Sequence, residues 1–118
     1  MSIWMAVATT GLGLSLAASA TAQAPNGLMA RCVGAGDATS EQSVEACTAL
    51  LKAGTAPPEE IATIYHSRGQ AYNDLKRPDR ALADANEALR LKPGDASVLF
   101  WRAGLFVDLG KDEQALAD

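Results

Sequence analysis

The sequence predicts an all-α fold, a solenoid of helix-turn-helix repeats preceded by a signal peptide. The first observation is a repeat with a step of 34 residues (102 − 68), at which Arg68, Tyr72 and Asp84 recur as Arg102, Phe106 and Asp118. Gly69, Leu75, Ala81 and Leu82 likewise recur as Ala103, Leu109, Ala115 and Leu116. A two-helix repeat cannot bury its apolar face alone, so copies stack and share a core.

The second observation is the N-terminal segment, which carries no charged residue and is apolar or small almost throughout from Ile3 to Ala20. Small residues at alternate positions between Ala18 and Ala24 then offer three overlapping cleavage sites. Residues 1–24 are therefore predicted to be a signal peptide, and the protein to be exported, either periplasmic or secreted. The alternative is a membrane anchor formed by residues 3–22, a length that approaches a membrane span.

The net charge and the two cysteines bear on which kinds of ligand and which compartment the protein has. The chain has 10 basic and 14 acidic residues and a net charge of −4, which argues against binding to nucleic acid. Cys32 and Cys47 are its only cysteines, and in an oxidising compartment they are expected to form a disulfide. A catalytic thiol using His66 as base lacks an orienting group, and a zinc site lacks a fourth ligand. No metal and no cofactor is predicted.

The first helical segment is expected after an irregular stretch at residues 25–38. Thr39 and Gln42 have the spacing of a capping box, which opens a helix that Gly54 ends. Its apolar positions make one stripe, which includes Cys47, and the segment is in register with the second helix of the later copies. Residues 39–54 are therefore predicted to be a half repeat.

A complete repeat is predicted at residues 62–95. Its first helix starts at Pro57-Pro58-Glu59-Glu60 and its second at Pro78-Asp79, because proline and acidic residues favour the first turn of a helix. The residues of the second helix expected to face solvent are Arg80, Asp84, Glu87 and Arg90. Asp95 is then a candidate N-cap for a partial repeat at residues 96–118.

The two copies together resemble the tetratricopeptide repeat. The first reads Tyr65-x-x-Arg68-Gly69-x-x-Tyr72, followed by Ala81-x-x-x-Ala85, Ala88 and Pro93, and the second reads Leu99-x-x-Arg102-Ala103-x-x-Phe106, followed by Ala115. They depart from the family pattern in having Tyr65 and Leu99 for the usual Trp, arginine at 68 and 102 for the usual Leu, and Ala85 for an aromatic. The chain is thus similar to tetratricopeptide-repeat proteins of the exported bacterial type, over residues 39–118.

The resemblance implies a concave groove, lined by the first helices of successive repeats, that takes up a peptide or helix of a partner protein. By position in the repeat, the groove residues would be Thr63, His66, Gln70, Asn73, Asp74, Ser97, Phe100, Gly104, Val107 and Asp108. The alternative for each is a solvated helix face. None of them is basic, which disfavours the family's known recognition of acidic tails.

The predicted function is therefore a protein–protein interaction module. An enzyme is not expected, since the chain has no P-loop, no G-x-S-x-G and no H-E-x-x-H motif. The alternative is a structural or assembly subunit. Because Asp118 falls within the second helix of the last copy, either the chain is a fragment, or its C-terminal end is completed by another chain or by self-association through that end.

Overall fold

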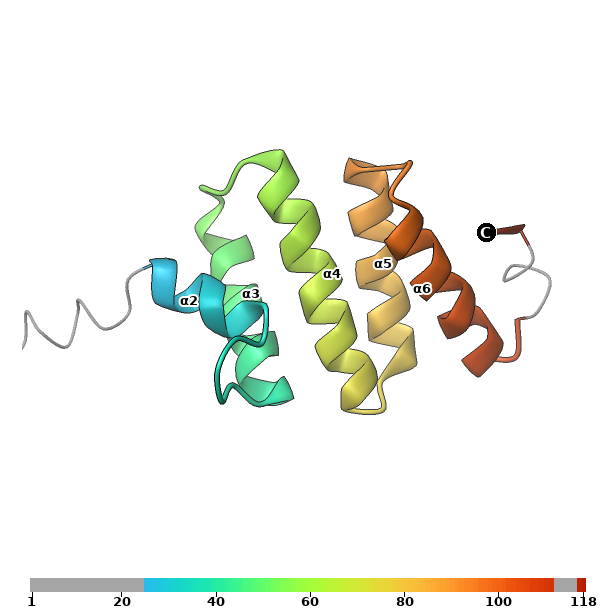
Figure 1. The fold of residues 1–118 in the computed structure, drawn as a ribbon, viewed down its shortest axis with the longest axis horizontal. Coiled ribbons are helices and arrows are strands. Elements are labelled where there is room, and N and C mark those ends of the chain that lie inside the picture. Colours follow the sequence, from blue (N-terminus) through green and yellow to red (C-terminus); the bar gives the residue numbers. More distant parts are fainter. Residues whose placement is uncertain (1–24, 112–116) are drawn as a thin grey trace, which may run out of the picture.

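A computed structural model describes residues 25–111 and 117–118, and shows five consecutive helices in the first of these ranges (Figure 1). The predicted signal peptide lies outside the described residues. The helices are α2 (Pro25–Cys32), α3 (Ser40–Ala53), α4 (Pro58–Asp74), α5 (Pro78–Leu91) and α6 (Ala96–Asp108). None of the helices in these ranges is long and apolar enough to cross a membrane.

The caps of α3 are those that the sequence predicts. The backbone N–H of Gln42 donates to Thr39 Oγ1 at 3.1 Å, and the N–H of Thr39 donates to Gln42 Oε1 at 2.9 Å. At the other end Gly54 adopts a left-handed conformation, with φ of 68°. The ends of a helix leave backbone N–H and C=O groups without hydrogen-bond partners. These short-range hydrogen bonds supply partners and so fix the limits of α3.

The later helices also begin at predicted residues. Pro58 and Pro78 are the first residues of α4 and α5. Asp95 caps α6 through its Oδ1 atom, which accepts hydrogen bonds from the backbone N–H groups of Ser97 and Val98. The proline and capping residues of the sequence therefore predict where α4, α5 and α6 begin. These helices form the complete repeat and the first helix of the next copy.

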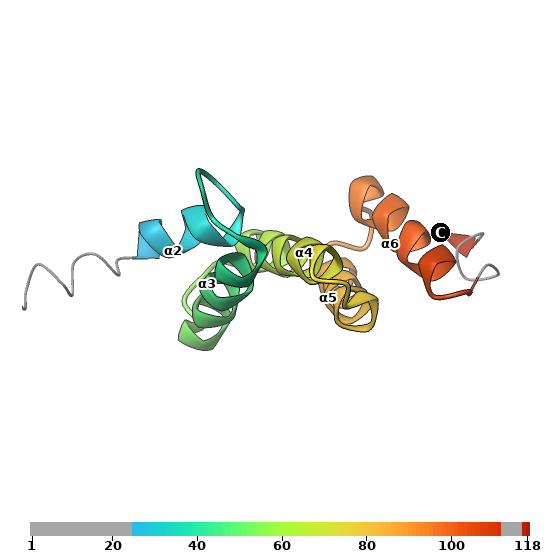
Figure 2. The same ribbon diagram turned by 90° about the horizontal axis from the view of Figure 1, so that it is seen from below.

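The helices stack as successive layers along one axis (Figure 1). Seen along the helices, α2 and α6 lie on one side and α3 and α5 on the other, with α4 between them (Figure 2). The buried side chains form two clusters. One joins α4, α5 and α6 around Ala85, Leu89 and Leu105, and the other joins α2, α3 and α4 around Cys47 and Ile64.

The predicted irregular stretch at residues 25–38 is only partly irregular, because Pro25–Cys32 forms α2. Leu28 and Met29 pack against the cluster that contains Ile64, and Ser43 Oγ of α3 donates a hydrogen bond to the carbonyl oxygen of Arg31 at 2.8 Å. An eight-residue helix is too short to be stable alone in water, so these contacts with α3 stabilise it. The half repeat predicted at residues 39–54 is thus preceded by a helix, and α2 lies on the same side of the stack as α6 (Figure 2).

Candidate partner-binding surface

The predicted groove residues lie on two adjoining strips of α4 and α6, about 70° apart around each helix. In α4, Thr63 and Gln70 each precede a buried residue, and in α6 Ser97 and Gly104 do the same. One residue is about 100° around a helix, so these side chains flank the buried face. We call this flank the polar row. It consists of Thr63, Gln70, Asp74, Ser97, Gly104 and Asp108, all of which are exposed.

The remaining four predicted residues lie on the adjoining strip of the same helices. Phe100 and Val107 each follow a buried residue of α6 by two positions, and His66 and Asn73 occupy the matching positions of α4, where they adjoin the buried Gly69. His66 and Asn73 are half-buried, whereas Phe100 and Val107 are 84% and 56% exposed. The difference arises because α6 packs beside α4, and among the described residues nothing packs in the same way beside α6.

The contact between α4 and α6 is made by Trp101, which the sequence analysis did not single out. Its indole ring lies 5.0 Å from the imidazole of His66, measured between ring centroids. A Cβ atom at Gly69 would collide with the same indole ring, and would also lie 3.1 Å from the Cβ of Asp84. The absence of a side chain at Gly69 therefore lets α6 approach α4. In the sequence, a glycine at position 69 within an apolar stripe indicates a close helix contact. The sequence pattern does not identify Trp101 as the residue that makes the contact.

Burial at this contact favours the neutral form of the His66 imidazole. Burial lowers the pKa of its imidazole, and the carboxylate of Asp95 acts in the opposite direction. Its Nε2 atom is buried and has no hydrogen-bond partner within residues 25–111 and 117–118. It lies beside a small cavity of about 30 Å³, which Thr63, Lys92 and Asp95 also line. His66 is thus a residue of the α4–α6 contact rather than an exposed groove residue.

The prediction that Asp84 faces solvent is wrong. Asp84 is buried, and its carboxylate accepts two hydrogen bonds from Arg68, at 2.9 Å from Nε and 2.8 Å from Nη2. The remaining Arg68 Nη1 donates to Thr48 Oγ1 on α3 at 3.2 Å. The guanidinium also lies within 6 Å of the ring centroids of Tyr65 and Tyr72. Asp84 lies on the side of α5 that faces α4 because a bidentate ion pair with Arg68 compensates its charge there.

The same ion pair recurs in the second copy. Arg102 donates to Asp118 through Nε and Nη2, and its Nη1 donates to Asn86 on α5 at 3.1 Å. In both copies the arginine therefore bonds the aspartate 16 residues later and a polar side chain of the preceding layer. This geometry explains why both copies have arginine where the family usually has leucine.

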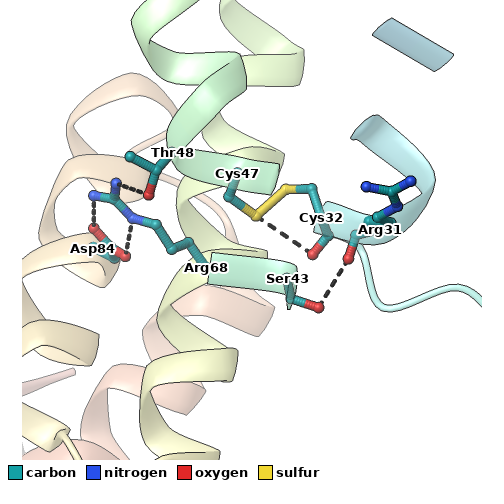
Figure 3. The surroundings of a disulfide bond; sticks show 7 residues. All are labelled: Arg31, Cys32, Ser43, Cys47, Thr48, Arg68 and Asp84. Atoms are coloured by element: carbon teal, nitrogen blue, oxygen red, sulfur yellow. Dashed lines mark hydrogen bonds and ion pairs between the residues drawn. A yellow bond between two sulfur atoms is a disulfide. The ribbon is translucent and has the colours of Figure 1, made fainter. Parts of the chain in front are cut away.

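Cys32 and Cys47 form a disulfide that ties α2 to α3 (Figure 3). The adjacent residue on α3, Thr48, points instead toward Arg68, so α3 is bonded to a helix on each side (Figure 3). Beside the disulfide is a cavity of about 210 Å³, open to solvent. Cys32 lines it from one side, and Gln70 and Asp74 of the polar row line it from the other.

Comparison with known proteins identifies one repeat in the chain. Residues 62–95 match the family model described as "Tetratricopeptide repeat", over the limits that the sequence predicts for the complete repeat. No match to the chain was found among solved structures. In the described parts of the chain, no group of three or more His, Cys, Asp or Glu side chains is arranged to hold a metal ion.

Proposed function

Because residues 62–95 make this chain a tetratricopeptide-repeat protein, we propose that it binds a peptide or helical segment of another protein along the polar row of α4 and α6. Tetratricopeptide repeats are in general protein-interaction modules without catalytic activity. The observation that carries the finer proposal is that the polar row is exposed on both helices at equivalent positions, with Thr63, Gln70 and Asp74 matched by Ser97, Gly104 and Asp108.

The side chains of the polar row suit a partner that presents hydrogen-bond donors. Its charged residues are Asp74 and Asp108, and within the described ranges neither forms an ion pair. Asp74 accepts one long hydrogen bond, from Ser40 Oγ at 3.4 Å. Lys76 shares a shallow cavity with Asp108, so the negative charge is partly balanced at that end. Backbone N–H groups and amide or basic side chains of a partner complement such a surface.

The test is a triple variant of the polar row, Gln70→Ala, Asp74→Ala and Asp108→Ala. All three positions are exposed, so the helical circular dichroism should be unchanged. Capture of partners from an extract of the native host, identified by mass spectrometry, should be lost. The affinity for a partner so identified should fall at least about tenfold, as expected for loss of the main contact residues.

The matched control is the double variant Glu87→Ala and Arg90→Ala. These side chains form an exposed ion pair on α5, away from the polar row. The control should retain every partner. If the triple variant retains the partners and the α5 variant loses them, the binding surface is formed by the second helices and the proposal is wrong.

We also propose that the protein acts outside the cytoplasm, after removal of residues 1–24. The buried disulfide supports this, since such bonds persist in oxidising compartments. The intact mass of the protein from its native host tests the proposal. A mature chain that begins at Thr21, Gln23 or Pro25 is expected, according to which of the three sites is used. A chain that begins at Met1 and is found in the membrane fraction would instead support the anchor formed by residues 3–22.

A further inference from the structure

The cavity beside the disulfide lies between two layers of the stack. One wall comes from the residues between Cys32 and Ser43, where α2 ends and α3 begins, and the other from Ser67 to Asp74 of α4. Every lining residue lies between positions 32 and 74, so the cavity does not form at either end of the described range. Its volume of about 210 Å³ is smaller than the roughly 300–1,000 Å³ of sites that take small molecules. The cavity is therefore of a size to take one side chain of a larger partner.

The wall between α2 and α3 is held in place by the fold. Cys32 is bonded to Cys47, and Ser43 Oγ donates a hydrogen bond to the carbonyl oxygen of Arg31 at 2.8 Å. Gly34 then turns the chain in a left-handed conformation, with φ of 75°. A ligand that enters a preformed site loses less of its affinity to ordering the protein.

The polar part of the lining presents oxygen atoms and one negative charge. It includes Ser40, Ser67, Gln70 and Asp74, and among the described residues that line the cavity there is no Lys or Arg. Asp74 Oδ2 accepts one long hydrogen bond, from Ser40 Oγ at 3.4 Å, which leaves Oδ1 without a donor within the described residues. A carboxylate oxygen beside hydroxyl and amide oxygens is a suitable set of acceptors for a cationic donor.

The position of Asp74 in α4 provides an independent observation. It is the last residue of the helix, and the last turn contains no basic residue. A carboxylate at the C-terminal end of a helix is unfavourable, because the helix dipole is negative there. Its contact with α3 is a single long hydrogen bond to a side chain, and no ion pair within the described ranges compensates its charge. A residue that opposes the stability of its own helix in this way is expected at a functional site.

The lining also has an apolar part, which includes Val33, Ala38 and Ala71. Val33 is 47% exposed, although it is a large apolar residue. Long basic side chains pack their methylene groups against apolar surface of this kind while the charged end reaches a polar group. The cavity therefore offers a surface for an apolar stem and a carboxylate for the charge at its end.

We infer that this cavity binds the side chain of a lysine in the partner segment, with its methylene groups against Val33 and Ala38 and its ammonium group on Asp74. The inference rests on the proposed function, since it names a residue that a segment bound along the polar row presents. The three donors of an ammonium group can reach oxygens that lie in different directions. The planar guanidinium of arginine binds a carboxylate best through both of its oxygens, and one oxygen of Asp74 already accepts from Ser40. Lysine therefore fits the lining better than arginine.

The experiment is an NMR titration of the ¹⁵N-labelled, disulfide-bonded protein with two capped pentapeptides of alanine. One has lysine at its centre and the other has norleucine, which has the same stem without the charge. The lysine peptide should bind with a dissociation constant of millimolar order and shift the amide signals of Gly34, Ser40, Gln70 and Asp74. The norleucine peptide should bind at least about tenfold more weakly. Equal affinities for the two peptides, or no shift of these signals, would overturn the inference.

Asp74→Asn separates binding from folding. It should weaken the lysine peptide by about tenfold and leave the norleucine peptide unchanged. The thermal midpoint should not fall, because the change removes an unfavourable charge from the end of α4. The matched control is Glu59→Gln, which makes the same change of charge at an exposed residue of α4, 15 positions earlier (74 − 59) and about 22 Å away along the helix. It should bind the lysine peptide as the wild type does. A lower thermal midpoint with unchanged affinity for lysine would give Asp74 a purely structural role and overturn the inference.

The titration and the capture experiment with the polar-row variant fail independently. If the polar-row variant loses its partners but the protein does not prefer the lysine peptide, the proposed function holds and the lysine site is wrong. If the lysine peptide binds as expected but the polar-row variant keeps its partners, the lysine site holds and the proposed function is wrong.

Discussion

Trp101 fits against Gly69, so that the indole ring of one helix occupies the space that a side chain on the other would need. This contact joins the first helix of the complete repeat to the first helix of the next. It depends on two residues 32 positions apart (101 − 69) and brings α6 against α4.

Gly69→Ala should destabilise the protein. The new Cβ would collide with Trp101 and lie 3.2 Å from the backbone oxygen of Ala81, which cannot move as a side chain can. Overpacking of this kind costs about 1–3 kcal/mol. Urea denaturation at low protein concentration measures it. Gly104→Ala is the matched control and should stabilise by up to about 1 kcal/mol, because it gains helix propensity without a clash. Equal effects of the two changes would contradict the proposed role of Gly69.

Asp84→Ala should be among the most destabilising single changes in the chain. It would leave the guanidinium of Arg68, whose side chain is 18% exposed, without its main partner between α4 and α5. Breaking a buried ion pair by removing one partner costs about 3–5 kcal/mol, and partial exposure should place this case near the lower figure. Glu87→Ala, in the exposed pair with Arg90, should change the free energy of unfolding by less than about 1 kcal/mol.

A double-mutant cycle with Arg68→Ala then isolates the pair itself. If Asp84→Ala costs the same in the presence and in the absence of Arg68, the ion pair does not account for the loss.

Protonation of His66 should destabilise the folded state in acid. Because burial lowers the pKa of His66 in the folded protein, the unfolded chain binds this proton more readily, and the free energy of unfolding falls as the pH drops below the usual pKa of 6.5. Thermal unfolding between pH about 7.5 and about 5 should show a larger decrease for the wild type than for His66→Gln. A titration of the His66 ring by NMR that gave a pKa at or above 6.5 would contradict this.

Reduction of the disulfide should selectively loosen the N-terminal helices. Closing a loop with 14 residues between Cys32 and Cys47 (47 − 32 − 1) stabilises by about 3 kcal/mol in the chain-entropy model. Reductant should therefore lower the thermal midpoint and speed amide exchange in α2 first. The variant with both cysteines changed to alanine should not respond to reductant. An unchanged midpoint in the reduced wild type would show that the bond contributes nothing to stability.

The sequence predicts features that depend on neighbouring residues better than those that depend on helix pairing. Thr39, Gly54 and Asp95 act on backbone groups a few positions away, so their roles follow from local chemistry. The helix α2 contains Gly27 and is short, and its stability comes from packing against α3 and from the disulfide, which composition does not reveal.

Asp84 was misassigned because helical periodicity separates charged from apolar residues but does not reveal a distant counter-charge. The repeat did carry a signal, since arginine and aspartate recur together as Arg102 and Asp118. The predicted groove residues lie on α4 and α6, but the repeat pattern does not show that His66 and Asn73 are half-buried whereas Phe100 and Val107 are exposed. The burial of His66 depends on the packing of Trp101, a residue 35 positions later in the sequence (101 − 66).

The linear succession of helices affects how the chain folds. The main contacts join consecutive helices, α2 with α3, α3 with α4, α4 with α5 and α5 with α6. Contacts between segments near in sequence need little loop closure, so folding should be fast for a domain of this size. The same topology lets one end open while the other remains ordered, and α6, which the disulfide does not constrain, should be the first of the described helices to detach as the protein approaches its unfolding transition.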